Sequence, residues 1–107
     1  MTKKLPEPVE TFKNGYPKVW EAFAQLGECC HEAGPLDAKT RRLVKLALTI
    51  GAGLEGAAHS AARNALASGI TVHEMKHVAV LAVTTLGFPA TMRALTWIDD
   101  HAAPKGR

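Results

Sequence analysis

Apolar residues recur along most of the chain at the three- and four-residue steps of amphipathic helices. Glycine and proline divide this pattern at Gly34-Pro35, Gly51, Gly69 and Gly87. The spacing predicts five helices, over about 17–33, 38–50, 54–68, 72–86 and 89–100. No segment has the two-residue alternation of a strand bounded by hairpin turns. The sequence therefore predicts an all-α protein with an N-terminal arm (1–15), one helical domain (16–101) and a C-terminal tail (102–107).

The third predicted helix has the most regular pattern in the chain. Its apolar positions follow the steps i, i+3, i+4, i+7, i+8, i+11 and i+12: Leu54, Ala57, Ala58, Ala61, Ala62, Ala65 and Leu66. Because most of these residues are alanines, we expect a neighbouring helix to approach this face closely. The second and fourth predicted helices are apolar on nearly all sides, and a chain of 107 residues cannot enclose both. The surplus apolar surface predicts a homo-oligomer.

Composition excludes several classes of function. The net charge is only +3, the basic residues are dispersed and aromatic residues make up 6%, which argues against a nucleic-acid-binding surface. No apolar run approaches the ~18 residues of a membrane span, and the N-terminus lacks the apolar centre of a secretory signal. The two cysteines, Cys29 and Cys30, are adjacent, and a disulfide between sequence neighbours is strained. We therefore expect a cytoplasmic protein that binds neither nucleic acid nor membranes.

The third predicted helix also carries the strongest candidate for chemistry. Glu55, His59 and Arg63 lie at i, i+4 and i+8, on one side of the helix. Here the carboxylate could orient the imidazole as a general base, beside an arginine that holds a substrate carboxylate. The alternative is a ladder of charged pairs, which stabilises a helix by about 0.2–0.5 kcal/mol per pair.

The remaining candidates have simpler explanations. His73 and His77 have the i, i+4 spacing of helical metal ligands, but no third ligand has a matching spacing. We therefore expect no metal and no cofactor, unless subunits share these histidines. Cys30 follows the apolar stripe of the first predicted helix and is expected in the core, whereas a redox role for Cys29 stays open. The tryptophans Trp20 and Trp97 are expected to pack in the core or at an interface, or to line a ligand pocket.

Three segments resemble the carboxymuconolactone decarboxylase family, which includes the AhpD-like alkylhydroperoxidases. They are Leu36-Asp-Ala-Lys-Thr-Arg-Arg-Leu-Val-Lys-Leu-Ala-Leu, His59-Ser-Ala-Ala-Arg-Asn-Ala-Leu-Ala-Ser-Gly-Ile-Thr-Val-His-Glu-Met and Leu86-Gly-Phe-Pro-Ala. The resemblance covers about residues 36–100. It implies an orthogonal helical bundle of the AhpD-like type that assembles into trimers or hexamers. It also implies action on a small organic acid or lactone, and hence a small carboxylate as ligand.

The AhpD-like members of that family carry the motif Cys-x-x-Cys-x-x-x-His and a glutamate one helix earlier. With Gly69 and Thr71 as anchors, this sequence has Leu54 and Ala57 at the cysteine positions. Ala61 and Arg42 occupy the positions of the histidine and the glutamate, whereas Arg63 matches an arginine of decarboxylase-like members. The peroxidase motif is therefore absent, and its face is expected to be packing surface. The alternative function is a non-catalytic oligomeric relative that binds a small molecule or a protein.

Overall fold

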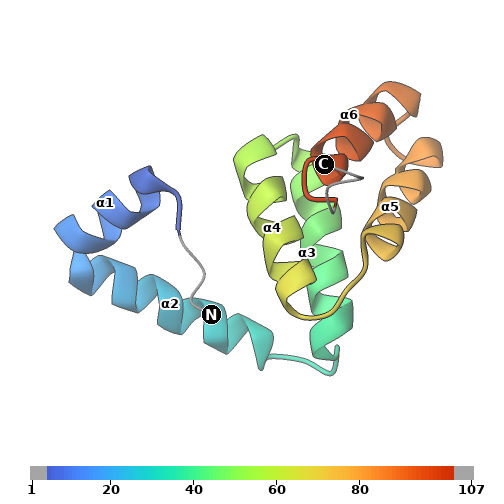
Figure 1. Ribbon diagram of the computed structural model, residues 1–107. Coiled ribbons are helices and arrows are strands. Elements are labelled where there is room, and N and C mark those ends of the chain that lie inside the picture. Colours follow the sequence, from blue (N-terminus) through green and yellow to red (C-terminus); the bar gives the residue numbers. More distant parts are fainter. Residues whose placement is uncertain (1–4, 103–107) are drawn as a thin grey trace. The chain divides into compact units, whose positions relative to one another are not determined.

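The computed structural model describes residues 5–102, and all the regular structure in that range is helical. Figure 1 shows the elements in chain order. They are α1 (Glu7–Gly15), α2 (Pro17–His31), α3 (Ala38–Ala52), α4 (Glu55–Ala67), α5 (Val72–Leu81), the 3-10 helix η1 (Ala82–Thr84) and α6 (Phe88–Asp99). The all-α prediction is confirmed. The longest of these helices have 15 residues, fewer than the roughly 20 that a membrane span requires.

The chain divides after Pro35 into two compact units. In the N-terminal unit, α1 forms within the predicted arm, with Pro8 in its first turn, where a missing N–H costs no hydrogen bond. The C-terminal unit begins at Leu36 and contains the other four α-helices. The predicted tail lies, from residue 103 onward, outside the described residues. The predicted domain limits at residues 16 and 101 stay predictions.

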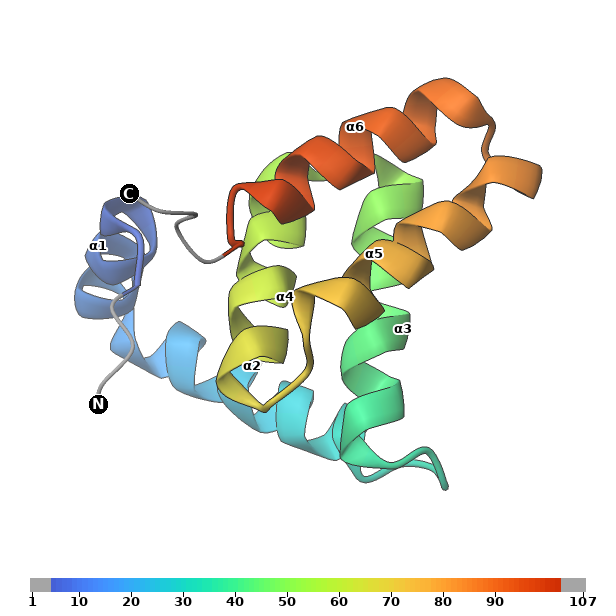
Figure 2. The ribbon, with the colours of Figure 1, turned by 45° about the vertical axis from the view of Figure 1, so that its right-hand side comes forward.

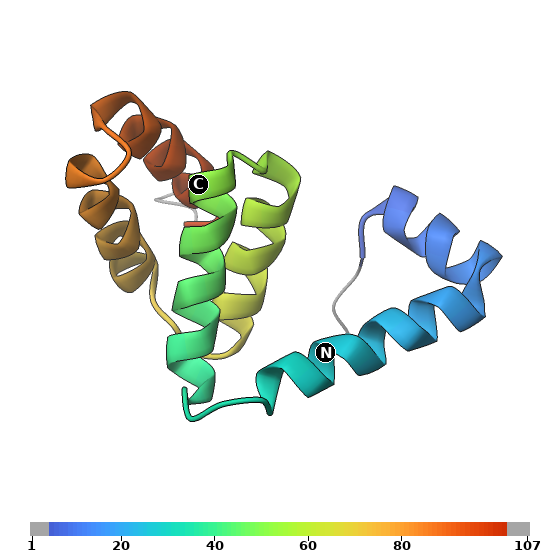
Figure 3. The same ribbon diagram turned by 180° about the vertical axis from the view of Figure 1, so that it is seen from behind.

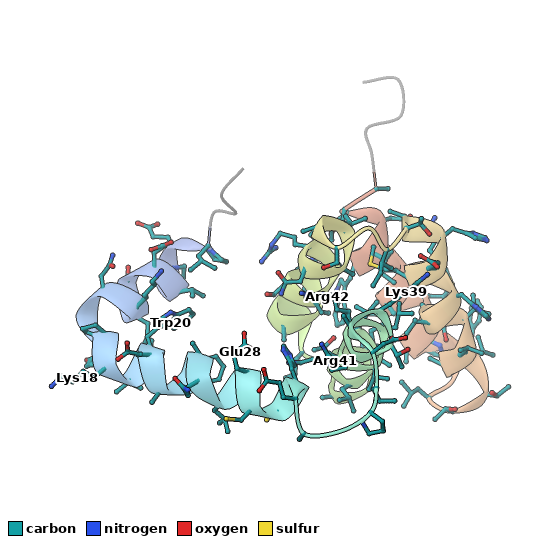
Figure 4. The ribbon with its side chains drawn as sticks, turned by 90° about the horizontal axis from the view of Figure 1, so that it is seen from below. Lys18, Trp20, Glu28, Lys39, Arg41 and Arg42 are labelled. Carbon is teal, nitrogen blue, oxygen red and sulfur yellow. The ribbon has the colours of Figure 1, made fainter. Side chains whose placement is uncertain are left out.

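In the N-terminal unit, α2 packs against α1. Trp20 lies on the α1 side of α2 and is half-buried, whereas Lys18 projects to solvent (Figure 4). The predicted apolar stripe of α2 faces elsewhere, and Phe23 at its centre is 63% exposed. Cys30, expected in the core, is exposed together with Cys29. That prediction was wrong because α1 alone is too small to cover both sides of α2.

The C-terminal unit is built on a hairpin of two antiparallel helices, α3 and α4, against which α5 and α6 pack (Figures 1 and 3). Asp37 caps α3 by accepting a hydrogen bond from the backbone N–H of Thr40 at 2.8 Å. Gly53 ends α3 in the left-handed conformation, with φ of 71°. The core consists of side chains from all four helices and the α4–α5 turn: Leu46, Ile50, Ala62, Ala65, Ile70, Met75, Ala79, Ala94 and Ile98.

Two local predictions differ from the structure. The fourth predicted helix ends at Leu81 and tightens into η1, because the β-branched run Val83-Thr-Thr85 is a weak helix former ahead of Gly87. In α4 the buried face is centred on Ala58, Ala62 and Ala65. Leu54 is 53% exposed, because as N-cap it has an extended backbone and leaves the helical stripe. Ala57 is also exposed and Ala61 is half-buried, so this face is not the closed packing surface that the sequence suggested.

Candidate functional site

A cluster of polar and aromatic side chains lies where the C-terminal end of α6 approaches α4 (Figure 2). Helix α4 contributes Glu55, His59 and Arg63, the three residues predicted from the sequence. The α6 segment contributes Arg93 and Trp97, with His101 just after the helix. Both sets have the spacing i, i+4, i+8, so each set occupies one side of its segment.

The two histidines of the cluster are hydrogen-bonded to each other. Nδ1 of His59 lies 2.7 Å from Nε2 of His101, and the ring centroids are 4.9 Å apart. His59 is well shielded, with a side chain only 19% exposed, and His101 is half-buried. One of the two nitrogens must carry the proton of this hydrogen bond, so the two imidazoles are linked in their protonation.

Two carboxylates determine which tautomer of His59 fits. Nε2 of His59 lies 3.4 Å from Oε2 of Glu55 and 3.9 Å from Oδ2 of Asp100. An ionised carboxylate only accepts hydrogen bonds, so Nε2 of His59 is assigned the proton. Nδ1 of His59 then accepts from the Nε2–H of His101, which leaves the lone pair of His101 on Nδ1. Glu55, His59 and His101 thus form one consistent chain of hydrogen bonds.

Trp97 forms the apolar wall of the cluster. It is 9% exposed, its ring centroid lies 6.3 Å from that of His59, and the guanidinium carbon of Arg93 lies 5.3 Å from it on the ring face. Trp97 is buried, in agreement with the first of its predicted roles, and the cation–π contact holds Arg93 against its ring face. The cluster therefore combines an acid–base pair with a cation that could bind an anionic group.

The charges around His101 favour its neutral form. Burial is the main cause that lowers the pKa of His101 below its ordinary value of 6.5. A proton on His59 and the charge of Arg63 lower this pKa further, and the carboxylate of Asp100 partly opposes them. The charge of Arg63 thus lowers the pKa of His101. A neutral imidazole at this position is available to accept a proton near pH 7.

Sequence reasoning found Glu55, His59 and Arg63 but missed the α6 side of the cluster. The signal for Arg93, Trp97 and His101 was their common i, i+4, i+8 spacing. His101 lies beyond the predicted end of the last helix, which hid the pattern.

The other predicted candidates lie elsewhere. His77 lines a groove of about 610 Å³ between α3 and the α5–η1 segment, whereas His73 is exposed on α5. Most side chains that line the groove are apolar: Leu43, Val44, Ala47, Ile50, Val78, Leu81, Ala82 and Leu86. His59 is not among the lining residues. Within residues 5–102 no three His, Cys, Asp or Glu side chains are placed to hold a metal ion.

Comparison with known proteins identifies the family of the chain. Residues 17–100 match the carboxymuconolactone decarboxylase family, and the chain belongs to it. The match confirms the resemblance seen at residues 36–100 and extends it through α2. The chain is also 29% identical, over 96 residues and 90% of both chains, to an uncharacterized protein of Methanocaldococcus jannaschii. Since the two cysteines of this chain are adjacent, it has no Cys-x-x-Cys motif.

Proposed function

We propose that this family member acts on a small organic acid or lactone at the cluster between α4 and α6. The observation that carries this proposal is the His59 imidazole, which is shielded against Trp97 and hydrogen-bonded through Nδ1 to a second imidazole at 2.7 Å. Glu55 stands at the other ring nitrogen. An imidazole held in this way is suited to general acid–base catalysis.

The arginines of the cluster support a substrate that carries a carboxylate. Arg93 is held over Trp97, and the charge of Arg63 reaches His101. Guanidinium groups bind carboxylates with two parallel hydrogen bonds, and their charge also stabilises an enolate that forms when a proton or carbon dioxide leaves. A substrate with a carboxylate and an acidic C–H bond therefore suits this cluster.

The test is a panel of small carboxylates and lactones offered to the full-length protein. Binding is read from the melting temperature, because a ligand at 100 times its Kd stabilises the fold by about 2.7 kcal/mol. Turnover is followed by loss of the compound and release of carbon dioxide. We expect His59→Ala to abolish turnover, whereas His73→Ala, on the exposed side of α5, leaves it unchanged. Turnover that survives His59→Ala contradicts the proposal.

The second candidate is a non-catalytic relative whose function lies in the groove between α3 and the α5–η1 segment. The observation that favours it is the size of the groove, about 610 Å³, which is within the range of small-molecule sites. His59 takes no part in this groove. For this function we expect an apolar ligand to bind equally well after His59→Ala and to be excluded by Ala47→Trp, which fills the groove.

For either function we propose a homo-oligomer in which a second copy covers apolar side chains that each chain leaves exposed. Val19, Phe23 and Leu26 on α2 are more than half exposed, and so are Leu48 and Leu81 in the C-terminal unit. The charges support association, because residues 5–35 carry five Glu and two Lys, whereas α3 carries four basic and no acidic residues. Light scattering at micromolar concentration measures the number of chains, and a monomer would contradict this proposal.

A further inference from the structure

We propose that Glu55, His59 and His101 form a proton relay whose outer end, Nδ1 of His101, is the catalytic atom that takes the proton from the substrate. This inference rests on the function proposed above and assigns a catalytic residue that the sequence did not suggest. His59, the residue singled out by its helix pattern, becomes a positioning and charge-carrying residue in the interior of the relay.

The hydrogen bonds of His59 support this order. Nε2 of His59 is directed to the carboxylates of Glu55 and Asp100, at 3.4 and 3.9 Å. Nδ1 of His59 is occupied by His101 at 2.7 Å. Both ring nitrogens of His59 are therefore engaged by the protein. In the part of the chain that the structure describes, the side-chain hydrogen bond of His101 uses Nε2, so its Nδ1 keeps a lone pair for a proton.

The surroundings of the two imidazoles indicate which of them holds the transferred proton. Burial of the His101 ring is the main reason that a positive charge on it is disfavoured; a proton on His59 and the charge of Arg63 add to this effect, and the carboxylate of Asp100 opposes it. His59 has Glu55 and Asp100 at its Nε2, and a positive charge there is compensated. The transferred proton is therefore assigned to His59, whose Nε2 has two carboxylate oxygens within 3.9 Å.

The transfer can be written with every proton accounted for. Nδ1 of His101 forms a bond to the substrate proton, and the electron pair of the broken C–H bond stays on the substrate as an enolate. The proton on Nε2 of His101 moves to Nδ1 of His59. His101 is then neutral again, as the Nδ1–H tautomer, and His59 is an imidazolium beside Glu55. Return of the proton along the same path to the enolate restores the starting state.

This mechanism has a spectroscopic signature that requires no substrate. Acid should add the first proton to the pair in the same way, so His59 becomes the cation while His101 stays neutral and changes from the Nε2–H to the Nδ1–H tautomer. Nitrogen-15 NMR of the histidine rings in the full-length protein distinguishes these species. In Glu55→Gln the proton should shift toward His101, because the carboxylate that stabilises the His59 cation is lost, and Glu55→Asp should restore the wild-type pattern. A titration in which His101 becomes the cation and His59 stays neutral overturns the relay.

Steady-state kinetics test whether Nδ1 of His101 is the catalytic atom. His101→Gln keeps a side-chain N–H that can donate to Nδ1 of His59 but has no basic nitrogen, so we expect kcat to fall about 10²–10⁴-fold with carboxylate binding retained. His73→Gln serves as the control on α5. Turnover within twofold of wild type in His101→Gln overturns the assignment. If NMR shows the relay and no compound of the panel reacts, the proposed function fails and the relay stands.

Discussion

Thr71 and Glu74 hold the start of α5 through a reciprocal pair of hydrogen bonds. The hydroxyl of Thr71 accepts from the backbone N–H of Glu74 at 3.0 Å, and the carboxylate of Glu74 accepts from the backbone N–H of Thr71 at 2.9 Å. Lys39 of α3 forms an ion pair with the second carboxylate oxygen. The hydrogen bond from Lys39 is the main cause that lowers the pKa of Glu74, followed by that from the Thr71 backbone. One exposed carboxylate thus joins a helix cap to a contact between two helices.

We expect Thr71→Ala to lower the free energy of unfolding by about 1 kcal/mol, because a backbone donor of α5 loses its partner. Urea denaturation measures the change, and Thr84→Ala, exposed in η1, should stay within about 0.5 kcal/mol of wild type. An equal loss in the two variants would contradict the capping role.

The lowered pKa of Glu74 predicts a direction for the pH dependence of stability. The folded-state pKa lies below the ordinary value of 4.5, so the contribution is complete above 4.5 and is lost as the pH falls through the folded-state value. Urea denaturation from pH 7 to pH 3 should show wild type more stable than Glu74→Gln at neutral pH, with the difference shrinking in acid. If the difference in stability between wild type and Glu74→Gln stays constant to pH 3, the ionised carboxylate of Glu74 is not its cause.

At the scale of elements, the turn between α3 and α4 sets the geometry of the cluster. α3 ends at Gly53, whose φ of 71° is unfavourable for a residue with a side chain. Two residues later, Glu55 begins α4 and brings His59 and Arg63 onto its polar side. The guanidinium of Arg93 lies close by, 3.7 Å from where a Cβ at Gly53 would stand. The left-handed turn at Gly53 therefore lies close to Arg93 of α6.

Two glycines near this turn give a matched pair of substitutions. Gly53→Ala should destabilise the fold by about 1–2 kcal/mol, because its backbone is left-handed. Gly51→Ala should stabilise it by up to about 1 kcal/mol, because Gly51 is helical with no atom within 4 Å of the added Cβ. Urea denaturation of both variants measures the two changes, and a loss of stability in Gly51→Ala would contradict this account.

At the scale of the whole molecule, the apolar side chains of α2 are left exposed. None of the residues in α1 or α2 is buried, although Val19, Phe23 and Leu26 form a regular stripe. Two short helices without a core are marginal in water. A second copy that covers this stripe would give α2 the stability that its own unit lacks.

Hydrogen exchange at two protein concentrations tests this proposal. The amides of α2 should become more protected as the concentration rises, whereas those around Ala62 and Ala65 in the core of α4 should not change. Phe23→Glu should remove the concentration dependence. Gln25→Glu adds the same charge to α2 away from the stripe and should preserve it. Protection of α2 that is independent of concentration would contradict association through this stripe.

The parts of the site that could be predicted are those that one helix determines. The i, i+4, i+8 positions of Glu55, His59 and Arg63 follow from helical geometry alone, and the structure places them together on α4. His101 is 42 residues from His59 in the sequence, so their contact depends on how α6 crosses α4. The exposure of Cys30 was mispredicted for a related reason, since a stripe reveals an apolar face but not whether a neighbour covers it.

By itself, the sequence determined the helical class, the helix breaks at Gly34-Pro35, Gly69 and Gly87, and the family signature. These features depend on residues within a few positions of one another, where backbone geometry leaves few choices. Only the tertiary structure decided which side of α4 is buried, that Leu54 and Ala57 are exposed, and that a second imidazole meets His59. Those outcomes depend on the packing of helices distant in sequence, which is set by the fit of whole surfaces rather than by any local pattern.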